Sequence, residues 1–117
     1  LSEDGLLMPE EHYLTLVNNN VTITKEFFDK DALIVENSGI KKVSLSKDCE
    51  PVVEVMFNAP VFGLWSAAGK GVPFVCIEPW YGRTDAIDSD GSLDAREWGN
   101  ELAGGETFTG GYRCKFL

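Results

Sequence analysis

A carboxylate between an apolar run and two aromatic residues is the feature of this sequence with the clearest chemical potential. Glu78 follows the run Pro-Phe-Val-Cys-Ile that begins at Pro73, and Trp80 and Tyr81 come soon after it. A carboxylate in such a setting suits proton transfer. Aromatic rings beside it suit a sugar pocket, because their faces stack on the apolar faces of sugars. The structural alternative is a strand-end carboxylate that accepts backbone hydrogen bonds or pairs with Arg83, with both aromatics used for packing.

The residues around Glu78 alternate as they would on a β-strand. Every second side chain in residues 74–80, Glu78 among them, shares one face, while Val75 and Ile77 share the other. The second face is apolar, so we expect Val75 and Ile77 in the core. Pro79 keeps the residue before it extended and cannot donate to a sheet ladder. The pattern therefore predicts that Glu78 is held rigidly where a strand leaves its sheet.

A second acidic pattern approaches the spacing of a calcium-binding loop. If Ala86 is taken as position 1, Asp88, Asp90, Gly91 and Glu97 fall at positions 3, 5, 6 and 12 of such a loop. Position 1 is then alanine instead of aspartate, and the residues before it do not have a helical pattern. An acidic turn is the preferred interpretation, and no metal site is expected.

Short segments of alternating apolar and polar residues, separated by turn residues, predict an all-β fold, an antiparallel β-sandwich. These segments lie at residues 13–17, 21–24, 33–35, 43–46, 52–57 and 112–116. One or two short helices are also expected. The first covers residues 24–30 with Thr24 as its N-cap, and the second is a helical turn over residues 94–98 capped by Ser92.

Length and composition indicate a single domain over residues 1–117. A net charge of −9 argues against binding to nucleic acid phosphates or to anionic membranes. Cys49, Cys76 and Cys114 are odd in number and widely spaced, which favours reduced thiols in a cytoplasmic protein over a zinc site. His12 is the only histidine and lies in a polar segment, so no Ser-His-Asp or Cys-His arrangement is expected. No cofactor is expected.

Several pieces of the chain together match one known family. They are Phe-Gly-Leu-Trp-Ser at 62–66, the block from Pro73 to Gly82, Asp85, Glu-Leu at 101–102 and Gly-Glu-Thr-Phe at 105–108, preceded by residues 23–28 and 31–34. In these pieces the chain resembles the C-terminal part of the aldose 1-epimerase (galactose mutarotase) family, most closely its LacX-like branch. The likeness covers most of the chain from about Val21 onward, and Cys-Ile-Glu-Pro-Trp at 76–80 is its most specific part.

This resemblance implies a large antiparallel β-sandwich, often called a supersandwich, that interconverts the α and β anomers of a free aldose. In the family, a late glutamate acts as base on the anomeric hydroxyl and a histidine acts as acid on the ring oxygen. Glu78 matches the base, and Asp31 is a weaker match to a sugar-binding aspartate. Trp80 and Tyr81 are the expected sugar-stacking residues, and Asp85 is expected to position the loop after the base. The expected partner is a small-molecule aldose.

The departures from the family are equally informative. Its acid histidines lie in a half that has no counterpart here, so the chain is expected to be a C-terminal fragment that carries the base and alone catalyses anomerisation poorly or not at all. A half-sandwich exposes apolar faces and sheet edges, so we expect a homodimer or association with an N-terminal half. The alternative function is a non-catalytic carbohydrate-binding or regulatory β-sandwich. A calcium-stabilised module using Asp88, Asp90 and Glu97 is a third, weaker hypothesis.

Overall fold

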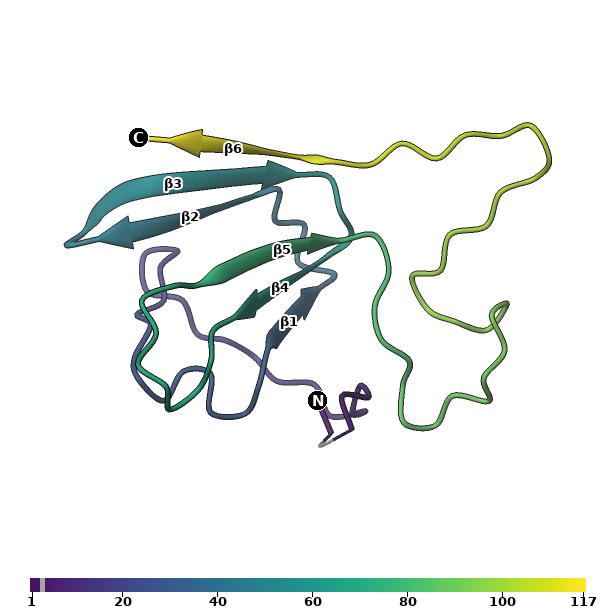
Figure 1. Ribbon diagram of the computed structural model, residues 1–117, viewed down its shortest axis with the longest axis horizontal. Helices are drawn as coiled ribbons and strands as arrows, with labels where there is room; N and C mark the ends of the chain where they lie inside the picture. Colours follow the sequence, from purple (N-terminus) through teal and green to yellow (C-terminus); the bar gives the residue numbers. More distant parts are fainter. Residues whose placement is uncertain (3) are drawn as a thin grey trace.

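The computed structural model describes residues 1–2 and 4–117 and consists of two three-stranded antiparallel sheets (Figure 1). The first sheet has the order β1-β4-β5. Its strands are β1 (Leu33–Glu36), β4 (Val61–Trp65) and β5 (Cys76–Trp80). The second sheet has the order β2-β3-β6, with β2 (Lys42–Lys47), β3 (Glu50–Phe57) and β6 (Tyr112–Phe116). The antiparallel β-sandwich predicted from the alternating pattern is confirmed.

The core lies where the two sheets meet. Val55 and Phe57 of β3 pack with Ala59 and with Phe62 of β4, and all four are at most 5% exposed. The rings of Phe57 and Phe62 lie 5.3 Å apart. Partly buried hydrophobic residues from both sheets surround this cluster: Val35, Ile40, Val43, Val53, Leu64, Ile77 and Tyr81. Because side chains alternate along a strand, each sheet presents one apolar face to this core.

The β2–β3 hairpin is closed by a two-residue turn. Lys47 pairs with Glu50, so Asp48 and Cys49 form a two-residue turn, and both have positive φ angles, of 53° and 68°. Two positive φ angles define the type I′ turn, whose twist matches that of the flanking strands. The register shifts between Leu45 and Ser46.

Neither expected helix forms. Residues 24–31 form consecutive turns instead. The amides of Phe27, Asp29 and Asp31 each donate to the carbonyl of the residue three positions earlier. Residues 94–98 likewise form turns, with bonds from Arg96 to Leu93 and from Gly99 to Arg96. Both segments are too short to repay the cost of starting a helix from local bonds alone. In the first, Phe28 is instead buried, with its ring edge-on to Phe27 at 4.9 Å.

The prediction of strands at residues 13–17 and 21–24 is also wrong. One antiparallel bridge between Val17 and Asn20 is formed there, across a turn in which Asn18 and Asn19 have positive φ. Tyr13 and Val17 are 92% and 70% exposed. Alternation alone does not make a strand, because sheet formation requires a partner edge and a surface that buries the apolar face.

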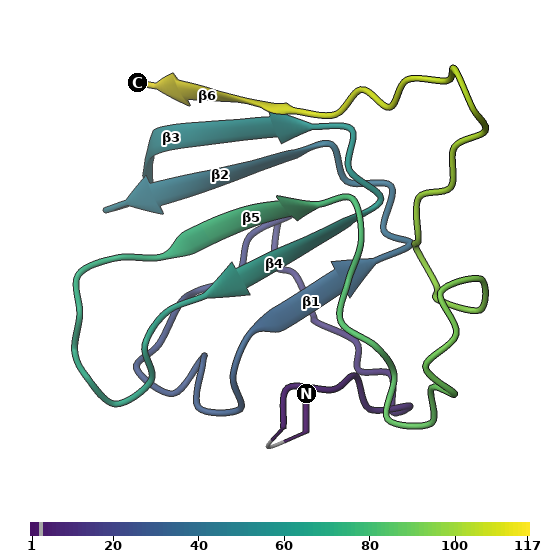
Figure 2. The ribbon, with the colours of Figure 1, turned by 45° about the vertical axis from the view of Figure 1, so that its right-hand side comes forward.

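A long segment without strands, residues 81–111, connects the first sheet to the edge of the second (Figure 2). Its first part is tied to the N-terminal residues. Leu7 and Ala86 form a parallel bridge, and the Thr84 hydroxyl donates to the carbonyl of Gly5 at 2.9 Å. No helix within residues 1–2 and 4–117 has the length and hydropathy needed to cross a bilayer.

Candidate functional site

The residues with chemical potential gather on the face of the first sheet that points away from the core, called here the outer face. Ile77 packs against the core, as predicted, so Cys76, Glu78 and Trp80 must project from the outer face. Val75 precedes β5 and is half-buried, but it is not among the residues packed against the core cluster. The parity argument therefore assigns Ile77 and Glu78 to the correct faces, although it assigns Val75 to the core in error. The prediction that the strand leaves its sheet at Glu78 is also wrong, because pairing with β4 continues through Pro79 to Trp80.

Glu78 is held by its neighbour on the same strand face. The Trp80 indole donates its Nε1–H to Glu78 Oε2 at 3.2 Å. Gly63 of β4 is directly opposite Glu78, and a Cβ atom at residue 63 would lie only 2.8 Å from Trp80 Cζ2. The indole therefore lies across the glycine, and the glycine is what lets Trp80 reach Glu78. Glu78 itself is half-buried at the surface of the sheet.

Cys76 flanks Glu78 on the other side. Burial raises the pKa of the Cys76 thiol, and the Glu78 carboxylate raises it further through its charge and a side-chain hydrogen bond. The thiol is therefore kept protonated, so it can donate to the carboxylate but is a weak nucleophile. Cys49 and Cys114, which are exposed, lack this environment.

Arg83 does not pair with Glu78, which was the structural alternative. It lies instead between Glu36 and Glu97, with Nη1 at 3.3 Å from Glu36 Oε1 and Nη2 in contact with Glu97 Oε2. The side chain of Arg83 is 4% exposed, whereas those of Glu36 and Glu97 are 27% and 73% exposed. Nε and Nη1 of Arg83 are buried without a hydrogen-bond partner. Because a buried charge is costly unless it is paired, Arg83 depends on these carboxylates.

Trp98 completes this cluster and was not expected at the site. Its Nε1–H donates to Glu36 Oε2 at 2.5 Å, and its φ angle is 58°. The left-handed region is uncommon for a bulky residue, and it persists only where surrounding contacts enforce it. The outer face thus carries two matched pairs, Trp80 with Glu78 and Trp98 with Glu36, each an indole that donates to a carboxylate.

Two open cavities lie beside these tryptophans. The larger is about 440 Å³ and is lined by Trp80, Gly82, Arg83, Thr84, Arg96, Trp98, Gly99 and Asn100. The smaller is about 300 Å³ and is lined by Glu36, Asn37, Glu97 and Trp98. Trp98 borders both. In the sheet register Val61 lies between Glu36 and Trp80, and it is fully buried, so the segment after β5 covers the outer face here.

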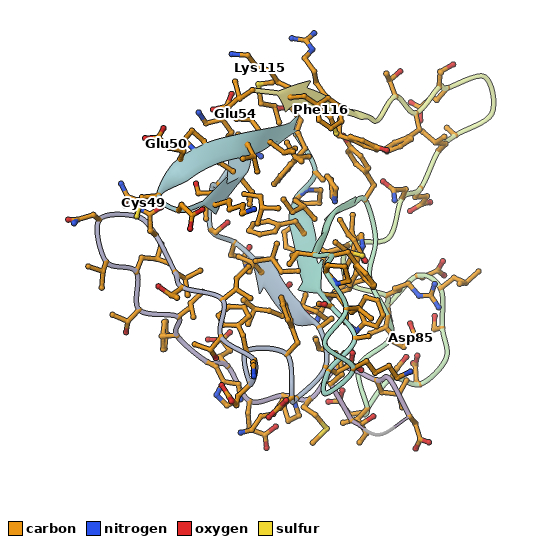
Figure 3. All side chains as sticks on the ribbon, turned by 60° about the vertical axis from the view of Figure 1, so that its left-hand side comes forward. Cys49, Glu50, Glu54, Asp85, Lys115 and Phe116 are labelled. Carbon is orange, nitrogen blue, oxygen red and sulfur yellow. The ribbon has the colours of Figure 1, made fainter. Side chains whose placement is uncertain are left out.

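Asp85 anchors that covering segment through its carboxylate and its backbone carbonyl. Its carboxylate bonds both Nε and Nη2 of Arg96, at 2.7 and 3.0 Å. Its backbone carbonyl accepts a bond from the amide of Leu7 at 2.9 Å. Figure 3 shows Asp85 in the loop region away from the second sheet, with its side chain near other polar groups. The bidentate pair fixes the start of the segment relative to residue 96, close to Trp98.

Two of the expected sugar-binding residues are not brought to Glu78. Asp31 lies in an exposed turn before β1, with φ 76°, and its carboxylate accepts from the amide of Ala32. Tyr81 packs against the core, with its ring edge-on to Phe108 at 5.3 Å. Its hydroxyl both accepts from the amide of Gly111 and donates to the carbonyl of the same residue. Tyr81 therefore acts as a packing residue that fixes the chain ahead of β6.

The calcium-loop pattern does not assemble. Asp90 accepts a hydrogen bond from the amide of Ser92, as an acidic turn residue does. Glu97 forms an ion pair with Arg83. Within residues 1–2 and 4–117 no group of three or more metal-ligating side chains comes together. His12 is exposed in the N-terminal segment.

The sequence contained one usable signal for the residues that were missed. Glu36 ends the apolar strand β1, and Trp98 follows Glu97 as part of the expected helical turn. Glu36 and Trp98 are 62 residues apart, and only the fold brings them together. Arg83 does not reach Glu78, because the register of β1 beside β4 supplies Glu36 as its partner.

Comparison with known proteins agrees with this architecture. No protein-family model matches the chain, and no curated protein matches it. Among solved structures, it is similar to the galactose mutarotase related enzyme from Lactobacillus acidophilus, with 37% identity, a TM-score of 0.75 and 83% of this chain covered. The chain spans about a third, 33%, of the length of that protein. The fold is thus a galactose mutarotase-like β-sandwich, and the similarity supports a place for this chain in the galactose mutarotase superfamily.

Proposed function

We propose that this chain carries the base of an aldose 1-epimerase-like (mutarotase) site of the LacX-like type, with Glu78 as the proton acceptor. The observation that carries the proposal is the placement of Glu78. It projects from the outer face, opposite a glycine, with one carboxylate oxygen bonded to Trp80. The 37% identity to a galactose mutarotase related enzyme supports the reaction class.

The reaction requires a base at the anomeric hydroxyl and an acid at the ring oxygen. Glu78 takes the proton of the anomeric hydroxyl through Oε1, since Oε2 accepts the Trp80 indole. The ring bond from C1 to the ring oxygen breaks as that oxygen gains a proton, and C1 becomes a carbonyl. Rotation about the C1–C2 bond and reversal of both proton transfers give the other anomer. A positioned base contributes about 10²–10⁴-fold to such a step.

The acid is not supplied by the residues around Glu78. The proton donors beside it on its strand face are the Trp80 indole, which donates to the Glu78 carboxylate itself, and the Cys76 thiol, whose raised pKa makes it a weak acid. His12 lies on the exposed N-terminal segment. The ring oxygen is therefore protonated by water or by a group that associates with the outer face, and the chain alone accelerates anomerisation weakly.

The test compares anomerisation rates by polarimetry, starting from freshly dissolved α-D-galactose and α-D-glucose. The chain should exceed the spontaneous rate, and Glu78→Gln should return the rate to the spontaneous value while leaving the fold intact. Glu54→Gln is the matched control, because Glu54 is a strand carboxylate on the second sheet. Equal rates for the wild-type chain and Glu78→Gln, both above the spontaneous rate, would refute the role of Glu78.

The second candidate is a non-catalytic carbohydrate-binding sandwich. It is favoured by the two tryptophans that line one open cavity beside Glu78, which suit binding without requiring a base. Calorimetric binding of aldoses by the chain, with anomerisation that stays at the spontaneous rate, would select this function over the first.

A further inference from the structure

The cavity between Trp80 and Trp98 is adjacent to Glu78 but does not include it. Trp80 lines this cavity and also donates to Glu78, whereas Glu78 is not among the lining residues. A single sugar ring held at the Glu78 carboxylate therefore leaves the cavity unfilled. We propose that this cavity binds a second, uncharged pyranose ring, so that the preferred ligand is a reducing disaccharide whose reducing-end ring lies at Glu78, an inference that rests on the proposed function.

The chemistry of the lining fits a sugar ring. Two indoles provide aromatic surface, and Thr84, Asn100 and two arginines add polar groups, with no aliphatic side chain beyond that of the threonine. Ligand pockets for apolar molecules are lined mainly by hydrophobic side chains, and about 440 Å³ is within the usual range for a small-molecule site. Sugars combine apolar ring faces with many hydroxyl groups, which matches aromatic walls set among polar groups.

The charges around the cavity favour a neutral ligand over an anionic one. Arg83 is already compensated by Glu36 and Glu97, and Arg96 is compensated by both oxygens of Asp85. A phosphate or carboxylate would compete with these carboxylates for the arginines and would add a negative charge to a protein of net charge −9. A neutral sugar ring incurs neither of these costs.

The Trp98 side chain is preorganised for binding in the absence of a ligand. Its indole is fixed by Glu36 at 2.5 Å, and its backbone has φ 58°. Glu36 is in turn fixed at the end of β1 and paired with buried Arg83. Trp80, which also lines the cavity, is fixed by its bond to Glu78 and its contact with Gly63. Walls that are already ordered lose little conformational entropy on binding, which improves affinity.

Calorimetry on the whole chain tests the inference with lactose, cellobiose and maltose, each compared with D-glucose, the sugar at its reducing end. At least one disaccharide should bind more tightly than glucose by about tenfold, as expected for one additional well-packed aromatic contact. Trp98→Ala should abolish this difference between disaccharide and glucose. Trp65→Ala is the matched control, because Trp65 lies on the outer face of β4 at the end away from Val61 and Trp80. It should retain the difference.

Trp98→Phe keeps the aromatic wall but lacks the indole donor, so it should retain part of the preference and serves as the second variant if Trp98→Ala fails to fold. Equal affinities for all three disaccharides and glucose would overturn the inference, as would a preference that survives Trp98→Ala. Tighter binding of glucose 6-phosphate than of any disaccharide would overturn the neutral-ring assignment. The two proposals fail separately: Glu78→Gln tests anomerisation, while Trp98→Ala tests disaccharide preference.

Discussion

The indole of Trp80 lies so close to Gly63 that a Cβ atom at residue 63 would stand 2.8 Å from Trp80 Cζ2 and 3.1 Å from Cη2. Real Cβ contacts are longer, so any side chain here must displace the ring. Gly63 faces Glu78 across the β4–β5 register, and Trp80 donates to that same carboxylate. The glycine, the indole and the carboxylate therefore form one unit that spans two strands.

The first prediction concerns Gly63→Ala. The backbone of Gly63 does not have a positive φ, so alanine is compatible with the strand and the clash with Trp80 decides the outcome. Overpacking of this kind costs about 1–3 kcal/mol. The variant should show a lower free energy of unfolding in urea and should lose the Nε1 bond to Glu78, with weaker aldose binding.

Gly104→Ala is the control for this experiment, because nothing lies within 4 Å of its added Cβ atom. It should leave both unfolding and binding unchanged. In the double variant Gly63→Ala with Trp80→Ala, the second change should cost less than it does alone, because the clash has been removed. Strict additivity would contradict the proposed contact.

The second prediction contrasts the two carboxylates around Arg83. Glu36→Ala leaves a guanidinium that is 4% exposed with one remaining partner, Glu97, and also frees the indole of Trp98. Loss of a partner from a buried ion pair costs about 3–5 kcal/mol. Glu97 is 73% exposed, so Glu97→Ala should cost less than about 1 kcal/mol. Urea unfolding of both variants measures the difference, and equal costs would show that Arg83 does not depend on Glu36.

The sequence predicts the local part of this site well and the long-range part poorly. Alternation places Glu78 and Ile77 on opposite faces because both lie on one strand, where periodicity is a direct consequence of backbone geometry. Glu36 and Trp98 are 62 residues apart, so their bond depends on the order β1-β4-β5 and on the path of the segment after β5. No local sequence pattern encodes the strand order or the path of that segment.

The same distinction explains the errors in secondary structure. Residues 13–17 alternate as well as residues 112–116 do, but only the second set meets an open edge, that of β3. Residues 24–30 carry a helix cap and two phenylalanines, yet the burial of Phe28 is achieved by turns. Tyr81 was expected beside a sugar, but its position one residue past Trp80 turns it to the core, where Gly111 satisfies its hydroxyl.

The third prediction concerns the reactivity of the cysteines. Burial raises the pKa of Cys76, and the Glu78 carboxylate raises it further. Iodoacetamide near neutral pH should therefore modify the exposed Cys49 and Cys114 well before Cys76, since the thiolate is the reacting form. Glu78→Gln removes the charge and should speed modification of Cys76, as followed by peptide mass spectrometry.

The raised pKa of Cys76 also has a consequence for stability. A raised pKa favours the protonated thiol in the fold, so its contribution is complete below the pKa of the unfolded state, roughly 8.5. That contribution is lost as the pH rises through the higher value of the folded state. Cys76→Ser should therefore alter the alkaline limb of stability, whereas Cys49→Ser should not. Modification of Cys76 as fast as Cys49 in the folded protein would contradict both statements.

The fourth prediction concerns the acid limb of stability. The ammonium of Lys42 lies 2.9 Å from Glu54 Oε1, and this hydrogen bond lowers the pKa of Glu54, with smaller contributions from the charges of Lys42 and Lys115. Figure 3 shows Glu54 and Lys115 on neighbouring strands of the second sheet. A lowered pKa stabilises the fold above the unfolded value, about 4.3, and this support is lost as the pH falls through the folded value.

Glu54→Gln should therefore lower stability slightly at pH 7 and leave it less sensitive to acid below about pH 4.3. The effect should be small and should shrink in high salt, because the pair is at the surface. Glu50→Gln, at the exposed start of β3, is the control and should keep the wild-type acid limb. Unfolding in urea at several pH values gives the comparison, and identical acid limbs for Glu54→Gln and the wild type would reject the linkage.

The fifth prediction tests how the segment after β5 is fastened to the second sheet. The Tyr81 hydroxyl makes two bonds of 2.9 Å with the backbone of Gly111, the residue before β6. Tyr81→Phe keeps the ring in contact with Phe108 but removes both bonds, at a cost of about 1 kcal/mol. Water can reach Gly111, which is exposed, so its backbone groups are not left without partners.

In Tyr81→Phe, the amides of β6 should then exchange with solvent several-fold faster, while those of β4 and β5 keep their protection. Tyr112→Phe, which alters a tyrosine that is 67% exposed on β6 itself, should leave exchange unchanged. Uniformly faster exchange across both sheets would show instead that Tyr81 supports the whole fold through the core, since local fastening predicts a change confined to the β6 edge.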